Sequence, residues 1–224
     1  MTHLAPGVLE QIDALELVPG RPIVITDADE VLFAFMDGFV TYLERQGMSF
    51  DWSSFAITGN VKDPDGQPVP GEKVREHLGV FFARHTHELQ PVPGAADALS
   101  DLSGDAQIVV LSNVPTEGVE GRRAALARTG MDYPLVANAG LKGPAVKLIQ
   151  ERARATAIFI DDIPHNHASV AETIPSVWRL HFVADPRLAP MLPPSKDAHR
   201  RIDTWTEALP FIRTCLSGAA APLT

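Results

Sequence analysis

The sequence lacks several features that mark specialised classes of protein. Its 224 residues include one cysteine, Cys215, so no disulfide can form within the chain, which is usual in a reducing cytoplasm. No apolar run approaches the roughly 20 residues that a membrane-spanning helix needs. Residues 1–20 have no basic segment followed by an apolar one. We therefore predict a cytoplasmic protein without a signal peptide or a membrane partner.

Positive charge is also scarce. The chain has 19 lysines and arginines against 28 aspartates and glutamates, a net charge of −9 at pH 7. Such a surface repels the phosphates of nucleic acids, so we expect no nucleic-acid partner. A small anion can still bind where a metal ion reverses the local field. The sequence does not predict the oligomeric state.

What the sequence does contain is a set of short runs rich in Val and Ile, which we predict to be buried parallel strands. The runs cover residues 22–27, 106–113, 134–138, 156–162 and 176–183. Their continuous apolar character indicates a sheet that is covered on both faces. Helical patterns lie between most of them, and this alternation predicts an α/β fold with a doubly wound parallel sheet.

The alternation breaks between the first two runs. About 80 residues separate them, far more than one crossover helix needs. Residues 32–46 and 73–89 have helical patterns, and the Pro- and Gly-rich residues 60–72 between them predict a loop or hairpin. We therefore predict a core made of residues 1–33 and 91–224, with a small, mainly helical insert at 34–90.

Polar side chains follow the apolar runs, at the edge where open parallel sheets bind ligands. They are Asp27, Asp29, Ser112, Asn113, Asp161 and Asp162, with Lys142 at the start of the helix before the fourth run. Carboxylates gathered at one edge repel one another unless a cation lies between them, and Mg²⁺ prefers such oxygen ligands. A site of this kind suits phosphoryl transfer, in which a carboxylate can be the nucleophile.

Four segments in this order resemble the motifs of the haloacid dehalogenase-like (HAD) superfamily. They are IVITDADEVL (23–32), VVLSN (109–113), LKGPAVKLI (141–149) and AIFIDDIPHN (157–166). The resemblance covers residues 20–185. It implies a Rossmann-like, three-layer core with strand order 5-4-1-2-3 and a cap inserted after the first motif.

The resemblance also implies a role for each polar residue. Asp27 would attack phosphorus, and Asp29 would protonate the leaving oxygen and then deprotonate water. Lys142 would neutralise Asp27 and the phosphate. The phosphate-binding set would be Ser112, Asn113 and Lys142, and the Mg²⁺ set would be Asp27, Asp29, Asp162 and Asp161, the last acting through water.

The predicted function is therefore Mg²⁺-dependent hydrolysis of a small phosphorylated metabolite, a phosphomonoester, through an aspartyl-phosphate. Dehalogenases of the superfamily lack the second Asp of the first motif, so Asp29 favours phosphate esters or anhydrides. Two alternatives stay open, namely a phosphomutase or phosphotransferase of the same superfamily and a non-catalytic phosphate-binding scaffold. The sequence does not identify the substrate or the pathway.

The sequence leaves two sets of residues open. Lys147 competes with Lys142 as the active-site lysine, although Lys142 is favoured because it lies at a junction of loop and helix. The insert carries Arg84, His85 and His87 near its end. Whether these three contact the substrate is not determined by the sequence.

Overall fold

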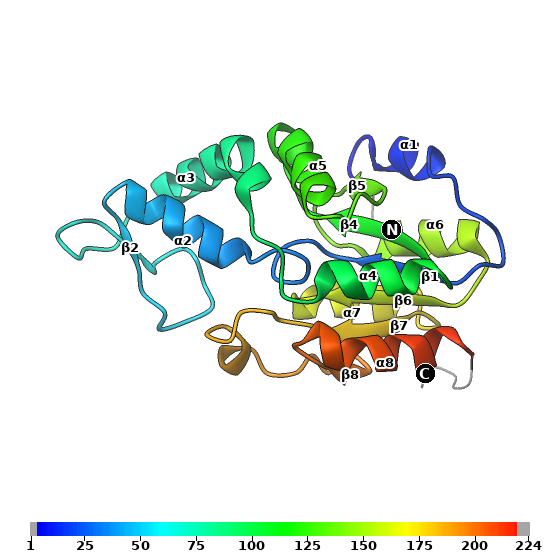
Figure 1. The fold of residues 1–224 in the computed structure, drawn as a ribbon. Coiled ribbons are helices and arrows are strands. Elements are labelled where there is room, and N and C mark those ends of the chain that lie inside the picture. Colours follow the sequence, from blue (N-terminus) through cyan, green and yellow to red (C-terminus); the bar gives the residue numbers. More distant parts are fainter. Residues whose placement is uncertain (1–3, 219–224) are drawn as a thin grey trace.

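The computed structural model describes residues 4–218 and has the predicted α/β fold with a parallel sheet (Figure 1). The sheet strands are β1 (Ile23–Thr26), β4 (Gln107–Ser112), β5 (Leu135–Ala137), β6 (Ala157–Asp161), β7 (Trp178–His181) and β8 (Arg200–Arg201). Their order is β5-β4-β1-β6-β7-β8. When the five predicted strands are numbered 1 to 5 along the sequence, they lie in the predicted order 5-4-1-2-3, read from β7 to β5. The sequence did not predict β8, which adds a short strand at the edge of the sheet.

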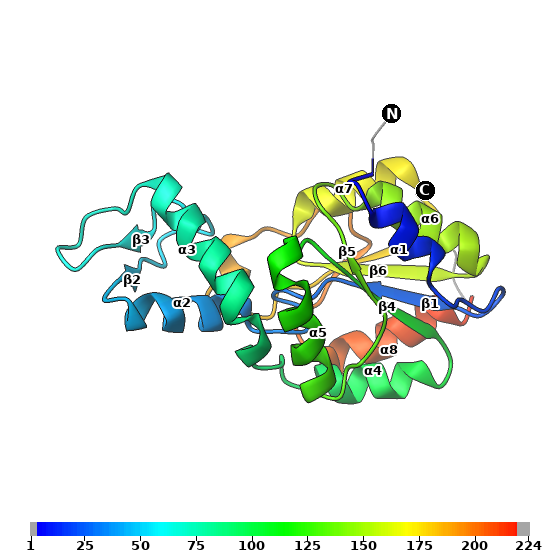
Figure 2. The ribbon, with the colours of Figure 1, turned by 90° about the horizontal axis from the view of Figure 1, so that it is seen from above.

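Helices cover both faces of the sheet, which gives the three layers (Figure 2). Ile23 and Ile25 face a cluster that includes α1 (Val8–Asp13), α6 (Gly143–Ala153) and α7 (Pro164–Thr173). Val24 faces the opposite cluster with α4 (Ala95–Ser103), α5 (Val119–Arg128) and α8 (Trp205–Leu216). Central strands are buried on both sides, which explains their continuous apolar runs. Within residues 4–218 no helix is both long and apolar enough to cross a bilayer.

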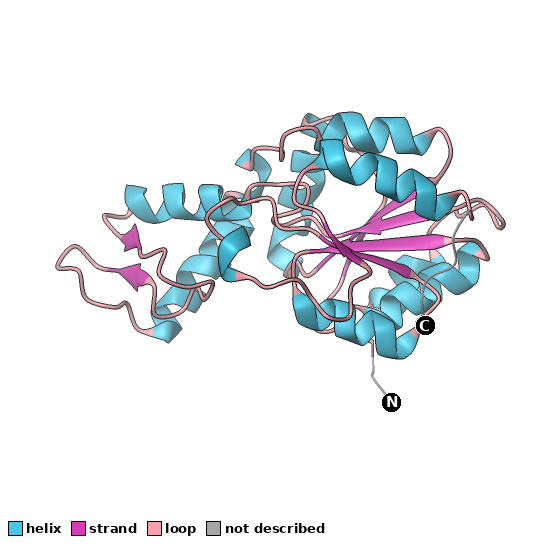
Figure 3. Ribbon diagram, turned by 90° about the horizontal axis from the view of Figure 1, so that it is seen from below, coloured by secondary structure: helices cyan, strands magenta, loops and turns pink. Residues whose placement is uncertain are grey.

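Between β1 and β4 the chain leaves the sheet and forms a separate group of elements. These are α2 (Phe35–Arg45), β2 (Ser49–Phe50), β3 (Val61–Lys62), α3 (Gly71–Arg84) and the 3₁₀-helix η1 (Thr86–Glu88). They lie beyond the carboxyl ends of the sheet strands, and β2 and β3 pair there as a small antiparallel hairpin (Figure 3). The second helix ends at Arg84, earlier than the predicted 89, because the chain tightens into η1.

The insert is joined to the core by two segments of chain that run side by side. The Ala34 amide donates to the Gln90 carbonyl (3.0 Å), and the Val92 amide donates to the Leu32 carbonyl (2.8 Å). Aromatic rings fill the space between α2 and α3, with Phe39 and Phe81 at a centroid distance of 5.3 Å. The insert is thus tied to the core by paired segments of chain, and its aromatic residues are continuous with the hydrophobic cluster on one face of the sheet.

A close contact between α6 and α7 fixes the start of α6. A Cβ on Gly143 would lie 2.4 Å from the Ser169 carbonyl oxygen, and backbone atoms cannot move aside. We predict that Gly143→Ala lowers the free energy of unfolding by about 1–3 kcal/mol. Gly79→Ala, in α3 with open space around it, should raise the same quantity by about 0.5–1 kcal/mol. Urea unfolding of both variants checks this, and equal stability of Gly143→Ala and wild type would contradict it.

Candidate active site

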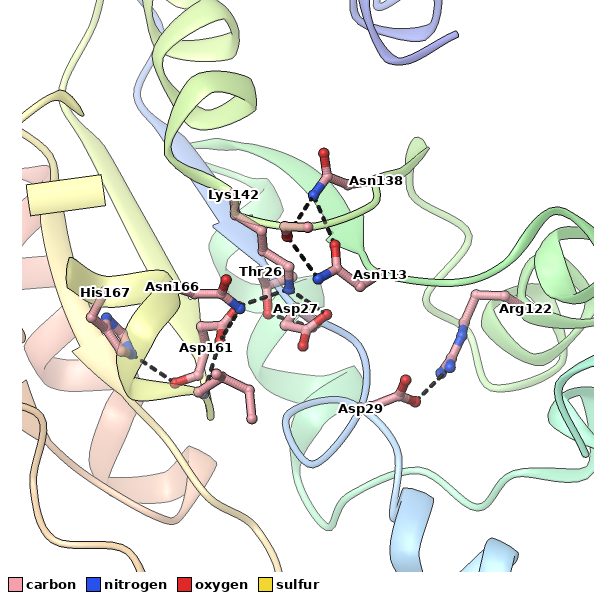
Figure 4. Close-up of polar contacts among 12 residues, drawn as sticks. Thr26, Asp27, Asp29, Asn113, Arg122, Asn138, Lys142, Asp161, Asn166 and His167 are labelled. Carbon is pink, nitrogen blue, oxygen red and sulfur yellow. Dashed lines mark hydrogen bonds and ion pairs between the residues drawn. The ribbon is translucent and has the colours of Figure 1, made fainter. Parts of the chain in front are cut away.

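The register of two central strands brings the first carboxylates together. Thr26 of β1 pairs with Ile160 of β6, and the Asp27 amide donates to the Ile160 carbonyl (2.8 Å). Asp27 and Asp161 therefore emerge side by side, with Asp162 next in the chain. One carboxylate oxygen from each of these three buried residues lies within 4.8 Å of the others. The sheet itself thus builds a cluster of three carboxylates, of which Figure 4 shows Asp27 and Asp161 on either side of Lys142.

Lys142 is the cation within this cluster. It precedes α6, its side chain is 1% exposed, and its Nζ lies 2.8 Å from Asp27 Oδ1 and 2.7 Å from Asp161 Oδ2. Lys147, further along α6, is half-exposed and lies 3.9 Å from Glu151. Of the two candidate lysines, the structure places Lys142 among the carboxylates and Lys147 on the surface.

The two acids at the end of β6 have different surroundings. Asp161 Oδ1 accepts hydrogen bonds from the Ile163 amide (2.9 Å) and from Asn166 Nδ2 (3.0 Å), while Oδ2 faces Lys142. The Asp162 carboxylate is buried and accepts no hydrogen bond from residues 4–218. Asp162 therefore has oxygen atoms to offer to a ligand, whereas both oxygens of Asp161 are already used.

Two buried histidines hold the backbone of these acids, and the sequence analysis did not predict them. His167 Nε2 donates to the Asp161 carbonyl and His181 Nε2 to the Asp162 carbonyl, each at 2.9 Å. His181 Nδ1 accepts from the Ser195 amide, so the proton of a neutral ring lies on Nε2. Burial lowers the pKa of His167 to about 3 and also lowers the pKa of His181. Both rings are therefore neutral donors at neutral pH.

The electrostatics of the cluster favour a cation. Burial raises the pKa of Asp27, and Lys142 only partly offsets this; burial and the charge of Asp161 raise the pKa of Asp162. Burial alone would lower the pKa of Lys142, but Asp161 and Asp27 raise it above its usual range. With all four groups ionised the cluster carries a net charge of −2, which a divalent cation neutralises.

The residues at the end of β4 differ in what they offer. The Ser112 hydroxyl is buried and has no hydrogen-bond partner among the described residues. Asn113 Nδ2 donates to the Gly140 carbonyl (2.9 Å), and Asn138 Nδ2 donates to Asn113 Oδ1 (2.7 Å). The Asn113 side chain thus ties two loops together, which leaves its backbone, rather than its amide group, for a ligand.

Asp29 does not join the cluster around Lys142. Its side chain turns toward α5, where Arg122 Nη2 donates to Asp29 Oδ1 (Figure 4). Burial raises the pKa of Asp29, and Arg122 lowers it in part. Arg122 is not among the site residues predicted from the sequence. A signal was present, because Arg122 is a charged residue three positions after Val119 and three before Ala125, on the buried face of a helix.

The insert residues that the sequence left open lie at the end of α3 and in η1. His85 contacts the rings of Tyr42 (5.1 Å between centroids) and Phe81 (6.1 Å). Arg84 and His87 are exposed. Whether any of these three residues contacts a substrate stays open.

Several solved structures of other proteins have a similar fold. A haloacid dehalogenase-like hydrolase from Streptococcus pneumoniae aligns at a TM-score of 0.57 with 14% identity, over 85% of this chain and 97% of that chain. The Bacillus subtilis protein YfnB, solved bound to magnesium, aligns at 0.57 with 13% identity, over 87% and 99%. The L-2-haloacid dehalogenase of Xanthobacter autotrophicus, with chloropropionic acid covalently bound, aligns at 0.52 with 14% identity, over 88% and 99%.

In sequence, no protein-family model and no curated protein matches this chain. At identities this low, likeness to the solved structures shows the fold alone. The chain therefore has the fold of the haloacid dehalogenase-like hydrolases, which confirms at the level of fold what the four motifs indicated.

Glu30, next to Asp29, is a buried carboxyl at the entrance to the insert. Its Oε1 accepts from the Met36 amide at the start of α2 (2.7 Å), and its Oε2 has no partner among residues 4–218. Burial raises its pKa from 4.5 to about 8, although the Met36 hydrogen bond opposes this. The folded state therefore holds a proton on Glu30 that the unfolded state releases, so wild type loses stability as the pH rises through this interval.

We predict that Glu30→Gln, which keeps the acceptor for Met36 but cannot ionise, gains stability relative to wild type between about pH 5.5 and pH 8.5. The gain should be at least about 1 kcal/mol, since one pKa unit corresponds to about 1.4 kcal/mol. Urea unfolding in a metal chelator at both pH values checks this. Glu72→Gln, at an exposed position of α3, is the control for loss of a carboxylate. A difference between Glu30→Gln and wild type that is the same at both pH values would contradict the prediction.

Proposed function

We propose that the protein is a Mg²⁺-dependent phosphohydrolase that cleaves small phosphomonoesters through an aspartyl-phosphate on Asp27. The observation that carries this proposal is the division of contacts in the carboxylate cluster. Lys142 and the surrounding donors occupy the Asp161 carboxylate, whereas the Asp162 carboxylate accepts no hydrogen bond from residues 4–218. Within this cluster, Asp27 and Asp162 are then the two carboxylates that can contact a substrate or a metal ion.

The chemistry of this donor set fits Mg²⁺. Three carboxylates lie within ligand distance of one another, their net charge with Lys142 is −2, and all the donors are oxygen atoms. Asp27 and Asp162 would hold the ion, with Asp161 behind them. The ion would supply charge neutralisation for the phosphoryl group.

The residues of the chain account for both halves of the reaction. Asp27 attacks phosphorus, the bond from phosphorus to the ester oxygen breaks, and Asp29 gives its proton to that oxygen. Asp29, now a carboxylate, takes a proton from the water that attacks the aspartyl-phosphate, and phosphate and Asp27 are released. Ser112, whose hydroxyl has no partner in the described chain, and Lys142 donate to the phosphoryl oxygens.

The presence of Asp29 selects among reactions that the fold supports. An alkoxide is a poor leaving group and needs a proton, whereas a halide leaves without one. A side-chain acid beside the nucleophile is therefore useful for phosphate esters of alcohols and has no task in dehalogenation. A scaffold that only binds phosphate would need neither the acid nor the nucleophile.

We further propose that the insert of residues 34–90 acts as a cap on the core of residues 1–33 and 91–224. It lies beyond the carboxyl ends of the strands, where the carboxylate cluster is found (Figure 2). Arg187 of the core contacts Asp37 of α2 and lies over the ring of Trp52 at 3.7 Å. Such a cap would exclude water and select the alcohol part of the substrate.

Two variants distinguish the proposed roles of Asp27 and Asp29. Asp29→Asn keeps the nucleophile but lacks the proton shuttle, so steady-state turnover should fall roughly 10²–10⁴-fold. With p-nitrophenyl phosphate and Mg²⁺ it should release one equivalent of nitrophenolate and then stall, because this leaving group needs no proton. Intact-mass measurement should find one added phosphoryl group, which is absent in Asp27→Asn.

Controls make this result specific. Asp132→Asn, at an exposed position outside the site, should behave as wild type, and a chelator should abolish the burst. A screen of phosphorylated metabolites in the presence of excess glycerol distinguishes water from an alcohol as the final acceptor. Phosphorylation of Asp27→Asn, or normal turnover by Asp29→Asn, would show that the roles are assigned wrongly.

A further inference from the structure

Arg122 is the largest buried side chain next to the candidate site for which the proposed chemistry has no role. It lies in the first half of α5 and is 0% exposed. Its single polar contact in the described chain is the ion pair from Nη2 to Asp29 Oδ1, and its guanidinium lies over the ring of Phe33 at 5.3 Å. Nε and Nη1 are buried and have no partner among residues 4–218.

Stability alone is a poor explanation for an arginine in this place. Burying a guanidinium costs free energy, and each donor left without an acceptor adds to the cost. A hydrophobic residue of similar length would fill the same space beside Phe33 without that cost. The pairing with Asp29 is therefore the feature that sets Arg122 apart from the apolar residues along the same face of α5.

The fold presses α5 against the end of the insert at this point. A Cβ on Gly118 would lie 3.0 Å from the Phe82 carbonyl oxygen, and one on Gly121 would lie 2.3 Å from Thr86 Oγ1. The two glycines thus let the start of α5 approach the end of α3 and η1 closely. Gly121 directly precedes Arg122, so this contact fixes the backbone from which the buried Arg122 side chain extends.

The consequence for Asp29 is a defined orientation. Oδ1 is held by Arg122, while Oδ2 accepts no hydrogen bond from residues 4–218, and the side chain is 21% exposed. Figure 4 shows the Asp29–Arg122 pair standing apart from the group around Lys142. Asp29 therefore has one anchored oxygen and one that is open to a substrate or a water molecule.

We propose that Arg122 is a positioning residue for Asp29, an inference that rests on the proposed function. By holding Oδ1 it leaves Oδ2 as the oxygen that gives a proton to the leaving alkoxide and afterwards takes one from the attacking water. Arg122 touches neither substrate nor phosphorus in this role. Its effect on the reaction passes through Asp29 alone.

This inference has a kinetic signature that a purely structural role does not have. The first step with p-nitrophenyl phosphate needs no proton, so Arg122→Met should leave the burst rate within about 2-fold of wild type. The second step needs Asp29 for every substrate. Steady-state kcat should therefore fall by about 10–100-fold, part of the roughly 10²–10⁴-fold that a proton shuttle contributes. KM should fall together with kcat, so that kcat/KM, which depends only on binding and the first step, changes by less than about 2-fold.

The experiment uses the full chain with Mg²⁺ and four variants. Arg122→Met removes the guanidinium, and Arg122→Lys keeps a positive charge and should retain kcat between that of Arg122→Met and wild type. Arg123→Met, the exposed neighbour that pairs with Glu120, is the matched control and should equal wild type. In the double variant Asp29→Asn/Arg122→Met, kcat should match that of Asp29→Asn within about 2-fold, because the partner through which Arg122 acts is already gone.

Each result decides the inference. It is overturned if Arg122→Met has wild-type kcat, if burst and steady state slow equally, or if Arg122→Met lowers kcat as much in the Asp29→Asn background as in wild type. Thermal unfolding shows whether Arg122→Met is folded; if it is not, Arg122→Lys carries the same comparison of burst and kcat. A wild-type protein that hydrolyses no phosphomonoester would instead refute the proposed function, so the two failures are distinguishable.

Discussion

The ammonium group of Lys142, held between the carboxylates of Asp27 and Asp161, is the interaction on which the rest of the site depends. The two acids lie at the ends of neighbouring parallel strands in register, so the sheet forces them together whatever else the chain does. Two buried carboxylates without a cation would be strongly destabilising, and losing one partner of a buried ion pair costs about 3–5 kcal/mol. The tight contact at Gly143 fixes the residue after Lys142 and thereby helps to keep its side chain in this place.

This ion pair determines which of the remaining charged groups are free to bind a ligand. Asp161 is fully used by Lys142, the Ile163 amide and Asn166, so its task is to hold the lysine and the turn after β6. Asp162 keeps its oxygens for a ligand. Asp29 is paired separately with Arg122. The site thus contains one cluster of charge −2, which suits a divalent cation, and one acid that is kept apart from it.

Much of the fold and of the candidate site could be predicted from the sequence, because the patterns that indicate them are local. Apolar runs locate the strands, the end of each run locates Asp27, Ser112 and Asp161, and the loop before a helix distinguishes Lys142 from Lys147. The pairing of Asp29 with Arg122 could not be predicted, since the residues are 93 positions apart and depend on how α5 packs. The histidines behind Asp161 and Asp162 are nearer in the sequence, at six and 19 positions, but their contacts with backbone carbonyls leave no pattern in it. The short helix α1 and the two-residue strand β8 are too brief to leave a pattern.

A crystal structure with Mg²⁺ and beryllium trifluoride, which forms an acyl-phosphate-like adduct on a nucleophilic aspartate, tests the central claim most directly. The account predicts beryllium on a carboxylate oxygen of Asp27, Mg²⁺ bound by Asp27 and Asp162, and fluorine atoms that accept from Lys142 Nζ and Ser112 Oγ. An adduct on Asp29 or Asp162, or Mg²⁺ bound with Lys142 displaced from Asp27, would contradict it.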